Sequence, residues 1–92
     1  MVTGRSRLPE SAPRIGLIED DAALRRLVVD YLGSHGYVVL AAENAATGRV
    51  LARDTSLDLL LLDLSLPDAD GLDLAREIRE YSAVPLDRKS VV

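Results

Sequence analysis

Four consecutive leucines at 59–62, with an aspartate on each side, constrain the fold of this chain more than any other feature. The run between Asp58 and Asp63 is too short for a helix, and without polar alternation it predicts a strand buried on both faces. Strands of this kind occur in parallel sheets that carry helices on both sides. The leucine run therefore predicts an α/β fold.

The rest of the chain follows the same plan, in which short apolar strands alternate with amphipathic helices. Apolar segments at 14–18 and 37–41 predict two further strands. Apolar residues at helical spacing predict helices that begin at Ala22, at Ala45 and at Leu72, with Asp21 and Asn44 capping the first two. The resulting β-α-β-α-β-α order is typical of a parallel sheet with right-handed crossovers.

Length and composition narrow the class of protein. Ninety-two residues make one domain at most, and residues 1–13, rich in Arg, Ser, Pro and Gly, are predicted to form a flexible leader. A formal net charge of −4 argues against nucleic-acid binding, and the lack of Cys excludes disulfides and thiolate metal sites. No apolar run approaches the ~20 residues that span a membrane, and the N-terminus has no secretory signal pattern. A cytoplasmic location without membrane association is therefore expected.

Acidic residues follow two of the predicted strands. Glu19, Asp20 and Asp21 come directly after 14–18, and Asp63 follows the leucine run. Ligands of open parallel sheets bind at the carboxyl ends of the strands, so neighbouring strands would bring these acids together. Such a cluster could hold Mg²⁺ beside a phosphoryl group, with one aspartate as a nucleophile. Acids after strands also serve simply as helix caps, and spacing alone leaves both interpretations open.

The stretch IGLIEDDAALRRLVVDYLGSHGYVV, followed by LDLLLLDLSLPDADGLDLAREIR, resembles the receiver domain of bacterial two-component response regulators. The similarity runs from about residue 14 to residue 85, and its most specific motif is DLSLPDADG at 63–71. It implies that Asp63 is the phosphoacceptor, that Glu19 and Asp20 hold Mg²⁺ with Asp63, and that the backbone carbonyl of Ser65 completes the metal site. It also implies that Asp21 caps the first helix and that Asp70 and Gly71 form the turn that caps the third.

The same resemblance implies a function and a partner. A sensor histidine kinase would donate a phosphoryl group to Asp63, so the chain would be a signalling protein and not an enzyme, apart from its own phosphorylation and dephosphorylation. The residues of this motif most resemble those of regulators that carry a C-terminal winged-helix DNA-binding domain. The chain has no room for such a domain, so direct nucleic-acid binding is not expected of it.

The similarity is expected to stop after Pro85. A receiver domain has a flavodoxin-like sheet of five parallel strands in the order 2-1-3-4-5, with helices on both faces, whereas three strands are predicted here. The charges of Asp87-Arg88-Lys89 disfavour a buried central strand, so 86–92 is predicted to be an unrelated or disordered tail and the domain to be truncated. Ser90 lies near the place of the family's switch hydroxyl, although the strand that carries this hydroxyl in the family is not predicted here.

Three other functions stay open at this stage. The chain could be a truncated, non-functional fragment, or it could compete for the docking surface of a kinase. It could also be a phosphatase of the haloacid dehalogenase type, which uses an aspartate nucleophile in the pattern Asp-x-Asp, but Ser65 stands where the second aspartate is needed.

A truncated domain also predicts self-association. The strand at 59–62 would be an exposed apolar edge, through which copies of the chain could associate.

Overall fold

The computed structural model describes the backbone of residues 12–89 and the side chains of 12–87. Most of the predicted leader, at 1–11, lies outside the described residues, as does Ser90 with the rest of 90–92. Strands and helices alternate throughout. Their bounds are β1 Arg14–Ile18, α1 Ala22–Ser34, β2 Val38–Ala42, α2 Ala45–Ala52, β3 Leu59–Asp63, α3 Gly71–Arg79 and β4 Leu86–Lys89.

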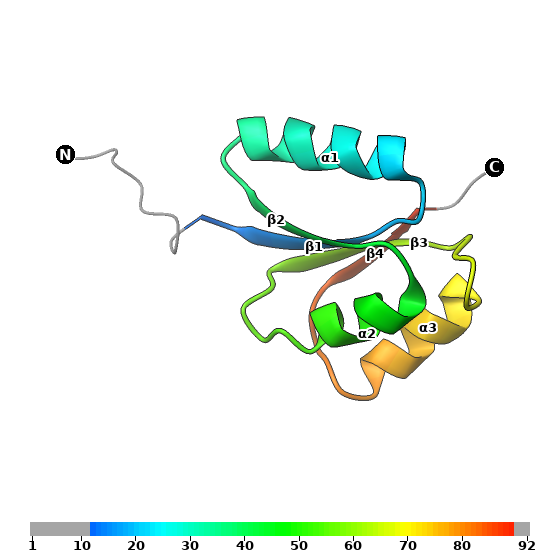
Figure 1. Cartoon of the computed structure of the whole chain (residues 1–92). Coiled ribbons are helices and arrows are strands. Elements are labelled where there is room, and N and C mark those ends of the chain that lie inside the picture. Colours follow the sequence, from blue (N-terminus) through cyan, green and yellow to red (C-terminus); the bar gives the residue numbers. More distant parts are fainter. Residues whose placement is uncertain (1–11, 90–92) are drawn as a thin grey trace.

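The strands form one parallel sheet in the order β2-β1-β3-β4. Helix α1 lies on one face of the sheet, and α2 and α3 lie on the other (Figure 1). This arrangement confirms the predicted flavodoxin-like α/β fold with helices on both faces. It also sets β1 beside β3, with Ile18 opposite Leu62, so the two strands end at the same edge of the sheet.

The α2 and α3 face contains most of the core. Leu60 and Leu62 of β3 are fully buried there, together with Leu74 and Ile78 of α3. Helix α2 packs very close to β1 at Gly48. A Cβ atom added there would lie only 2.7 Å from Cδ1 of Ile18. The glycine that weakens this helix in isolation thus permits its close packing on the sheet.

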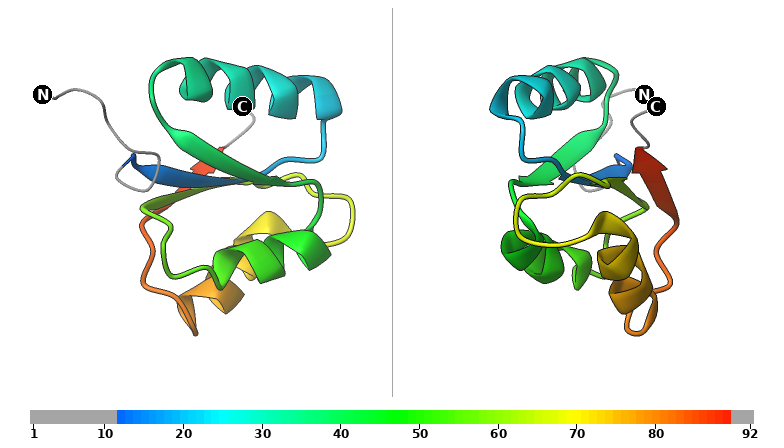
Figure 2. Two further views of the ribbon diagram at one scale, coloured as in Figure 1. Left: turned by 60° about the vertical axis from the view of Figure 1, so that its left-hand side comes forward. Right: turned by 90° about the vertical axis from the view of Figure 1, so that its right-hand side faces the viewer.

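The α1 face is covered less completely than the leucine run predicts. No residue of α1 is buried, and Leu27 and Tyr31 are 64% and 62% exposed. Leu59 and Leu61, which alternate with the buried leucines of β3, are only half-buried. The reason is that α1 is the one helix on this face among the described residues, and it packs mainly against β2 (Figure 2).

Beyond Pro85 the structure differs from the prediction, because Leu86–Lys89 forms a fourth strand. It pairs in parallel with β3 from Leu60↔Leu86 to Asp63↔Lys89, so the expectation of three strands with β3 at an open edge is wrong. The charge argument applied to a strand between two neighbours, whereas β4 is an outer strand, where charged side chains are common. Its Leu86 packs against the core, and Asp87 is exposed.

Candidate metal centre

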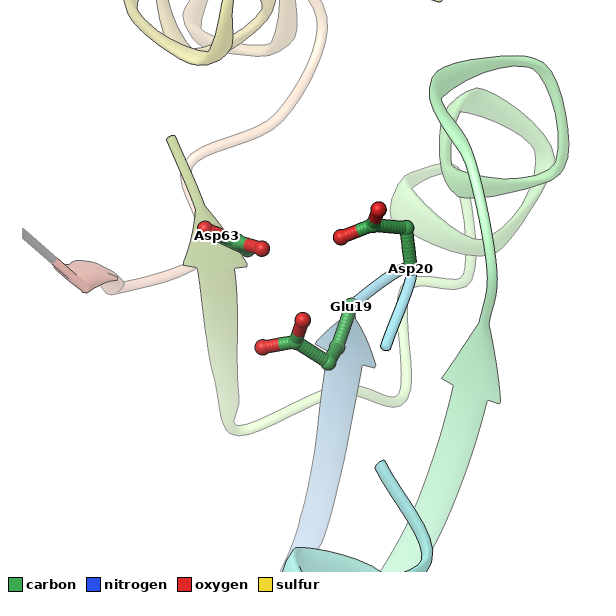
Figure 3. Close-up of side chains that lie close together, drawn as sticks. All are labelled: Glu19, Asp20 and Asp63. Atoms are coloured by element: carbon green, nitrogen blue, oxygen red, sulfur yellow. The ribbon is translucent and has the colours of Figure 1, made fainter. Parts of the chain in front are cut away.

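Three carboxylates converge where β1 and β3 end (Figure 3). Glu19 directly follows β1, Asp20 comes next, and Asp63 is the last residue of β3. Each offers an oxygen atom, and these three atoms lie within 4.8 Å of one another. Glu19 and Asp63 are buried, at 2% and 6% exposure, while Asp20 is exposed. The parallel pairing of β1 with β3 therefore brings together the three acids that the sequence singled out.

Backbone hydrogen bonds hold the segment that carries Glu19 and Asp20. The Glu19 amide donates to the carbonyl of Ala42 at the end of β2, at 2.9 Å. From α1, Nη1 of Arg25 donates to the carbonyl oxygens of Glu19 and Asp20, at 2.9 and 3.3 Å. The turn is thus fixed by a neighbouring strand on one side and by a helix on the other.

Asp21 has a different role from its two neighbours. Its side chain accepts a hydrogen bond from the Leu24 amide at 3.1 Å and caps α1, as predicted. Its own amide donates to Oε2 of Glu19 at 3.1 Å, which orients that carboxylate. Asp21 is not one of the three clustered acids.

The loop after β3 is ordered by short local contacts. The Ser65 amide donates to Oδ1 of Asp63 at 3.0 Å, so the residue expected to supply a carbonyl ligand orients the carboxylate of Asp63. Asp70 caps α3 by accepting from the amides of Leu72 and Asp73, at 2.7 and 3.3 Å, as the motif predicted. The carbonyl of Ser65 as a metal ligand stays a prediction, and so does the role of Ser90, which lies outside the described residues.

Sequence reasoning missed the contact of Asp68. Its two carboxylate oxygens accept hydrogen bonds from the amides of Ala45 and Ala46, the first two residues of α2, at 2.7 and 3.1 Å. These hydrogen bonds hold the pKa of Asp68 below its usual value, and the bond from the Ala45 amide has the largest effect. The partners lie more than twenty residues away, so no local capping pattern in the sequence could reveal the contact.

The donor set fits a hard divalent cation. All the side-chain ligands are carboxylate oxygens, which Mg²⁺ prefers, and the cluster contains neither His nor Cys, which zinc sites usually use. Three carboxylates this close repel one another, and a bound cation offsets that repulsion. The three acids can therefore hold Mg²⁺, which keeps several water ligands in such sites.

Known proteins share this fold and sequence pattern. A profile of the response regulator receiver domain matches residues 15–86. The transcriptional regulatory protein BaeR of Escherichia coli is 40% identical over 79 residues, which are 86% of this chain and 33% of BaeR. The KdpE regulator of Escherichia coli is 40% identical over 70 residues, which are 76% of this chain and 31% of KdpE. The chain thus spans about a third of the length of these relatives.

Solved structures agree with the sequence matches. The non-phosphorylated HemR receiver domain from Leptospira biflexa superimposes with a TM-score of 0.78 at 36% identity, over 83% of this chain and 62% of that one. The BeF3-activated receiver domain of Klebsiella pneumoniae RstA gives 0.76 at 31% identity, over 82% and 64% of the two chains. No helix in the described part of the chain has the length and apolar character needed to cross a membrane. The match of the profile to most of the chain shows that this protein belongs to the response regulator receiver domain family.

Proposed function

We propose that this chain accepts a phosphoryl group on Asp63 from a sensor histidine kinase. In this proposal Glu19, Asp20 and Asp63 hold Mg²⁺ together with the backbone carbonyl of Ser65. The observation that carries the proposal is the convergence of the three carboxylates within 4.8 Å at the carboxyl edge of the sheet. Membership of the receiver family supports it, and so does the likeness to a receiver domain, that of RstA, which was activated with BeF3.

In this reaction Asp63 is the nucleophile of a substitution at phosphorus. A carboxylate oxygen of Asp63 forms the new P–O bond, the P–N bond to the kinase histidine breaks, and the imidazole nitrogen keeps that electron pair. The product is an acyl phosphate on Asp63. When bound, Mg²⁺ supplies positive charge next to the oxygens of the transferred group.

The chain's own groups prepare Asp63 for this step. The Ser65 amide fixes Oδ1 of Asp63, and burial at the end of β3 limits the motion of its side chain. Glu19 is oriented by the amide of Asp21, so two of the three acids are fixed before any ligand arrives. The donor forms its phosphohistidine from ATP, and we therefore also propose a cytoplasmic location.

Phosphoramidate provides a test without a cognate kinase, because it carries the same P–N bond as phosphohistidine. We expect the wild-type chain with Mg²⁺ to gain the mass of one phosphoryl group, in a form that hydroxylamine removes, as it does from acyl phosphates. Asp63→Asn should gain none, although its amide oxygen can still accept from Ser65. The control is Asp73→Asn, which removes the same charge from an exposed position on α3.

Two results would contradict the proposal. A folded wild-type chain that gains no phosphoryl group with Mg²⁺ would favour a fragment without acceptor activity. Modification that persists in Asp63→Asn would show that another residue is the acceptor. Circular dichroism melting of each variant establishes that the compared samples are folded.

A further inference from the structure

One side chain, that of Asp68, ties the loop after β3 to the start of α2. We propose that Asp68 is a positioning residue for the metal centre, which keeps Asp63 and Ser65 in place by anchoring their loop to α2. This inference rests on the proposed function, because the positioned groups are the proposed acceptor and metal ligands. Asp68 itself is not one of the clustered acids.

The contact is built from strong, directional hydrogen bonds. Both oxygens of Asp68 are used, one by the amide of Ala45 at 2.7 Å and the other by that of Ala46 at 3.1 Å. A charged acceptor strengthens such bonds, and the first turn of a helix favours a negative charge. Ala45 is fully buried, so the anchor point is part of the core and not a mobile surface position.

Helix α2 also has a cap of its own, which separates the role of Asp68 from ordinary capping. The side chain of Asn44 accepts from the Thr47 amide at 2.9 Å. Asp68 accepts from the amides of the two residues before Thr47, although it lies in the loop that follows β3. It therefore joins two segments, whereas Asn44 stabilises one.

These two bonds complete a series of contacts that links the segments carrying the three acids. The Glu19 amide joins the end of β1 to Ala42 at the end of β2. Helix α2 begins three residues after Ala42, and Asp68 joins its first turn to the β3–α3 loop. The bond from the Ser65 amide to Oδ1 of Asp63 then links that loop back to the cluster. An ion pair of 2.8 Å between Arg49 and Glu77 also joins α2 to α3, but it involves residues further along both helices.

A shift of Asp68 is transmitted to Ser65 over a short distance. Three residue steps separate them, so their Cα atoms can be at most about 11 Å apart. Between them, the side chain of Leu66 is buried and Pro67 restricts the backbone. If the anchor is lost, one of the contacts that hold this loop is removed close to the point where it should present the Ser65 carbonyl.

The test compares Mg²⁺ affinity in the full chain and in three variants, Asp68→Ala, Asp68→Asn and Asp73→Asn, by titration followed with amide NMR signals. We expect Asp68→Ala to raise the Mg²⁺ Kd about 10-fold, the lower end of the loss seen when groups that orient metal ligands are removed. Asp68→Asn keeps one acceptor oxygen and should give a smaller increase. Asp73→Asn removes the same charge without touching the loop and should stay within about twofold of wild type.

A purely structural role of Asp68 would give a different result. It would lower the melting temperature but leave the Mg²⁺ Kd of the folded protein unchanged, and that outcome would overturn the inference. The Ala45 and Ala46 amide signals report the bond directly and should shift in both Asp68 variants before metal is added, while that of Thr47 shifts less. If Asp68→Ala does not fold, Asp68→Asn decides, and an unchanged Kd there overturns the inference.

The same titration separates this inference from the proposed function. If the wild-type chain binds no Mg²⁺, the proposed function fails and the inference fails with it. If wild type binds Mg²⁺ and Asp68→Ala binds it equally well, only the positioning role is refuted.

Discussion

Gly71 is the position in the site region where a single added methyl group should do most damage. It is the first residue of α3, and a Cβ atom placed there would lie 2.4 Å from Cα of Leu64. Non-bonded carbon atoms prefer a separation of about 3.5–4.0 Å, so Gly71→Ala creates an overlap of at least about 1 Å. The atoms in the way belong to the backbone next to Asp63, and no side-chain rotation can remove the overlap.

Relief therefore requires a backbone shift on one side of the contact. Both sides are held, because the Gly71 amide donates to the Leu64 carbonyl at 3.3 Å and Asp70 caps the same helix turn. Overpacking of this kind typically costs about 1–3 kcal/mol of unfolding free energy. For a domain of this size, each kcal/mol lowers the melting temperature by about 4–8 °C, which predicts a decrease of roughly 5–20 °C.

Gly33→Ala is the matched control, since it adds the same methyl group within α1. Nothing lies within 4 Å of the added atom, and alanine is the better helix former by about 1 kcal/mol. We expect this variant to melt at or slightly above the wild-type temperature in the same circular dichroism experiment. A Gly71→Ala chain that melts like wild type, or a Gly33→Ala chain that loses as much stability, would refute the packing argument.

Three further predictions concern the metal centre, the core and the cap of α3. Asp20→Asn should weaken Mg²⁺ binding by at least about 10-fold, while Asp73→Asn should not, and equal effects in the titration would contradict the assignment of Asp20. Leu60→Ala should cost about 2–5 kcal/mol in urea denaturation because its side chain is fully buried, whereas Leu27→Ala, at an exposed position, should stay within about 0.5 kcal/mol. Asp70→Ala should cost about 1 kcal/mol in the same assay because two amides of α3 lose their acceptor, and no loss would show that solvent replaces this cap.

Local sequence patterns were sufficient for most of the fold. The strand at 14–18 and the caps Asp21 and Asn44 depend on residues close in the sequence, and the structure has them as predicted. The cap Asp70 and the choice of Glu19, Asp20 and Asp63 from the acids after the two strands came from the resemblance to receiver domains. That the three acids lie together also required the strands before them to be neighbours. A buried leucine run in a parallel α/β fold makes that assumption reasonable, and the pairing of β1 with β3 confirms it.

The fourth strand could not be predicted from its own residues. Asp87, Arg88 and Lys89 lack the apolar pattern of a buried strand, and what makes them a strand is the free edge of β3. The backbone of β3 offers hydrogen-bonding groups to any segment that reaches it, as the bond from the Leu60 amide to the Pro85 carbonyl shows at 2.9 Å. Pairing of this kind is independent of side-chain type, and its energy does not appear in a hydrophobicity pattern.

The contacts of Asp68 and Arg25 were missed for a related reason. Both are polar side chains that bind backbone groups of another segment, so neither leaves a periodic or spaced signature. A loop aspartate such as Asp68 has the same sequence appearance whether it faces water or a distant helix. The three-dimensional arrangement of the segments decides between the two.

The segments around the three acids are held by more contacts than the sheet face that α1 covers. Strands β1 and β3, which end at the acids, each pair on both sides, and the segments around the acids are linked by Arg25, Ala42, Ser65 and Asp68. The α1 face instead leaves Leu27 and Tyr31 more than half exposed beside half-buried Leu61. The geometry of the acids is therefore set by strand pairing and short polar contacts, while the stability of the chain is limited by apolar burial elsewhere. It follows that substitution of a half-buried residue on this face, such as Leu61→Ala, should change how much of the chain is folded without changing the Mg²⁺ affinity of the folded fraction.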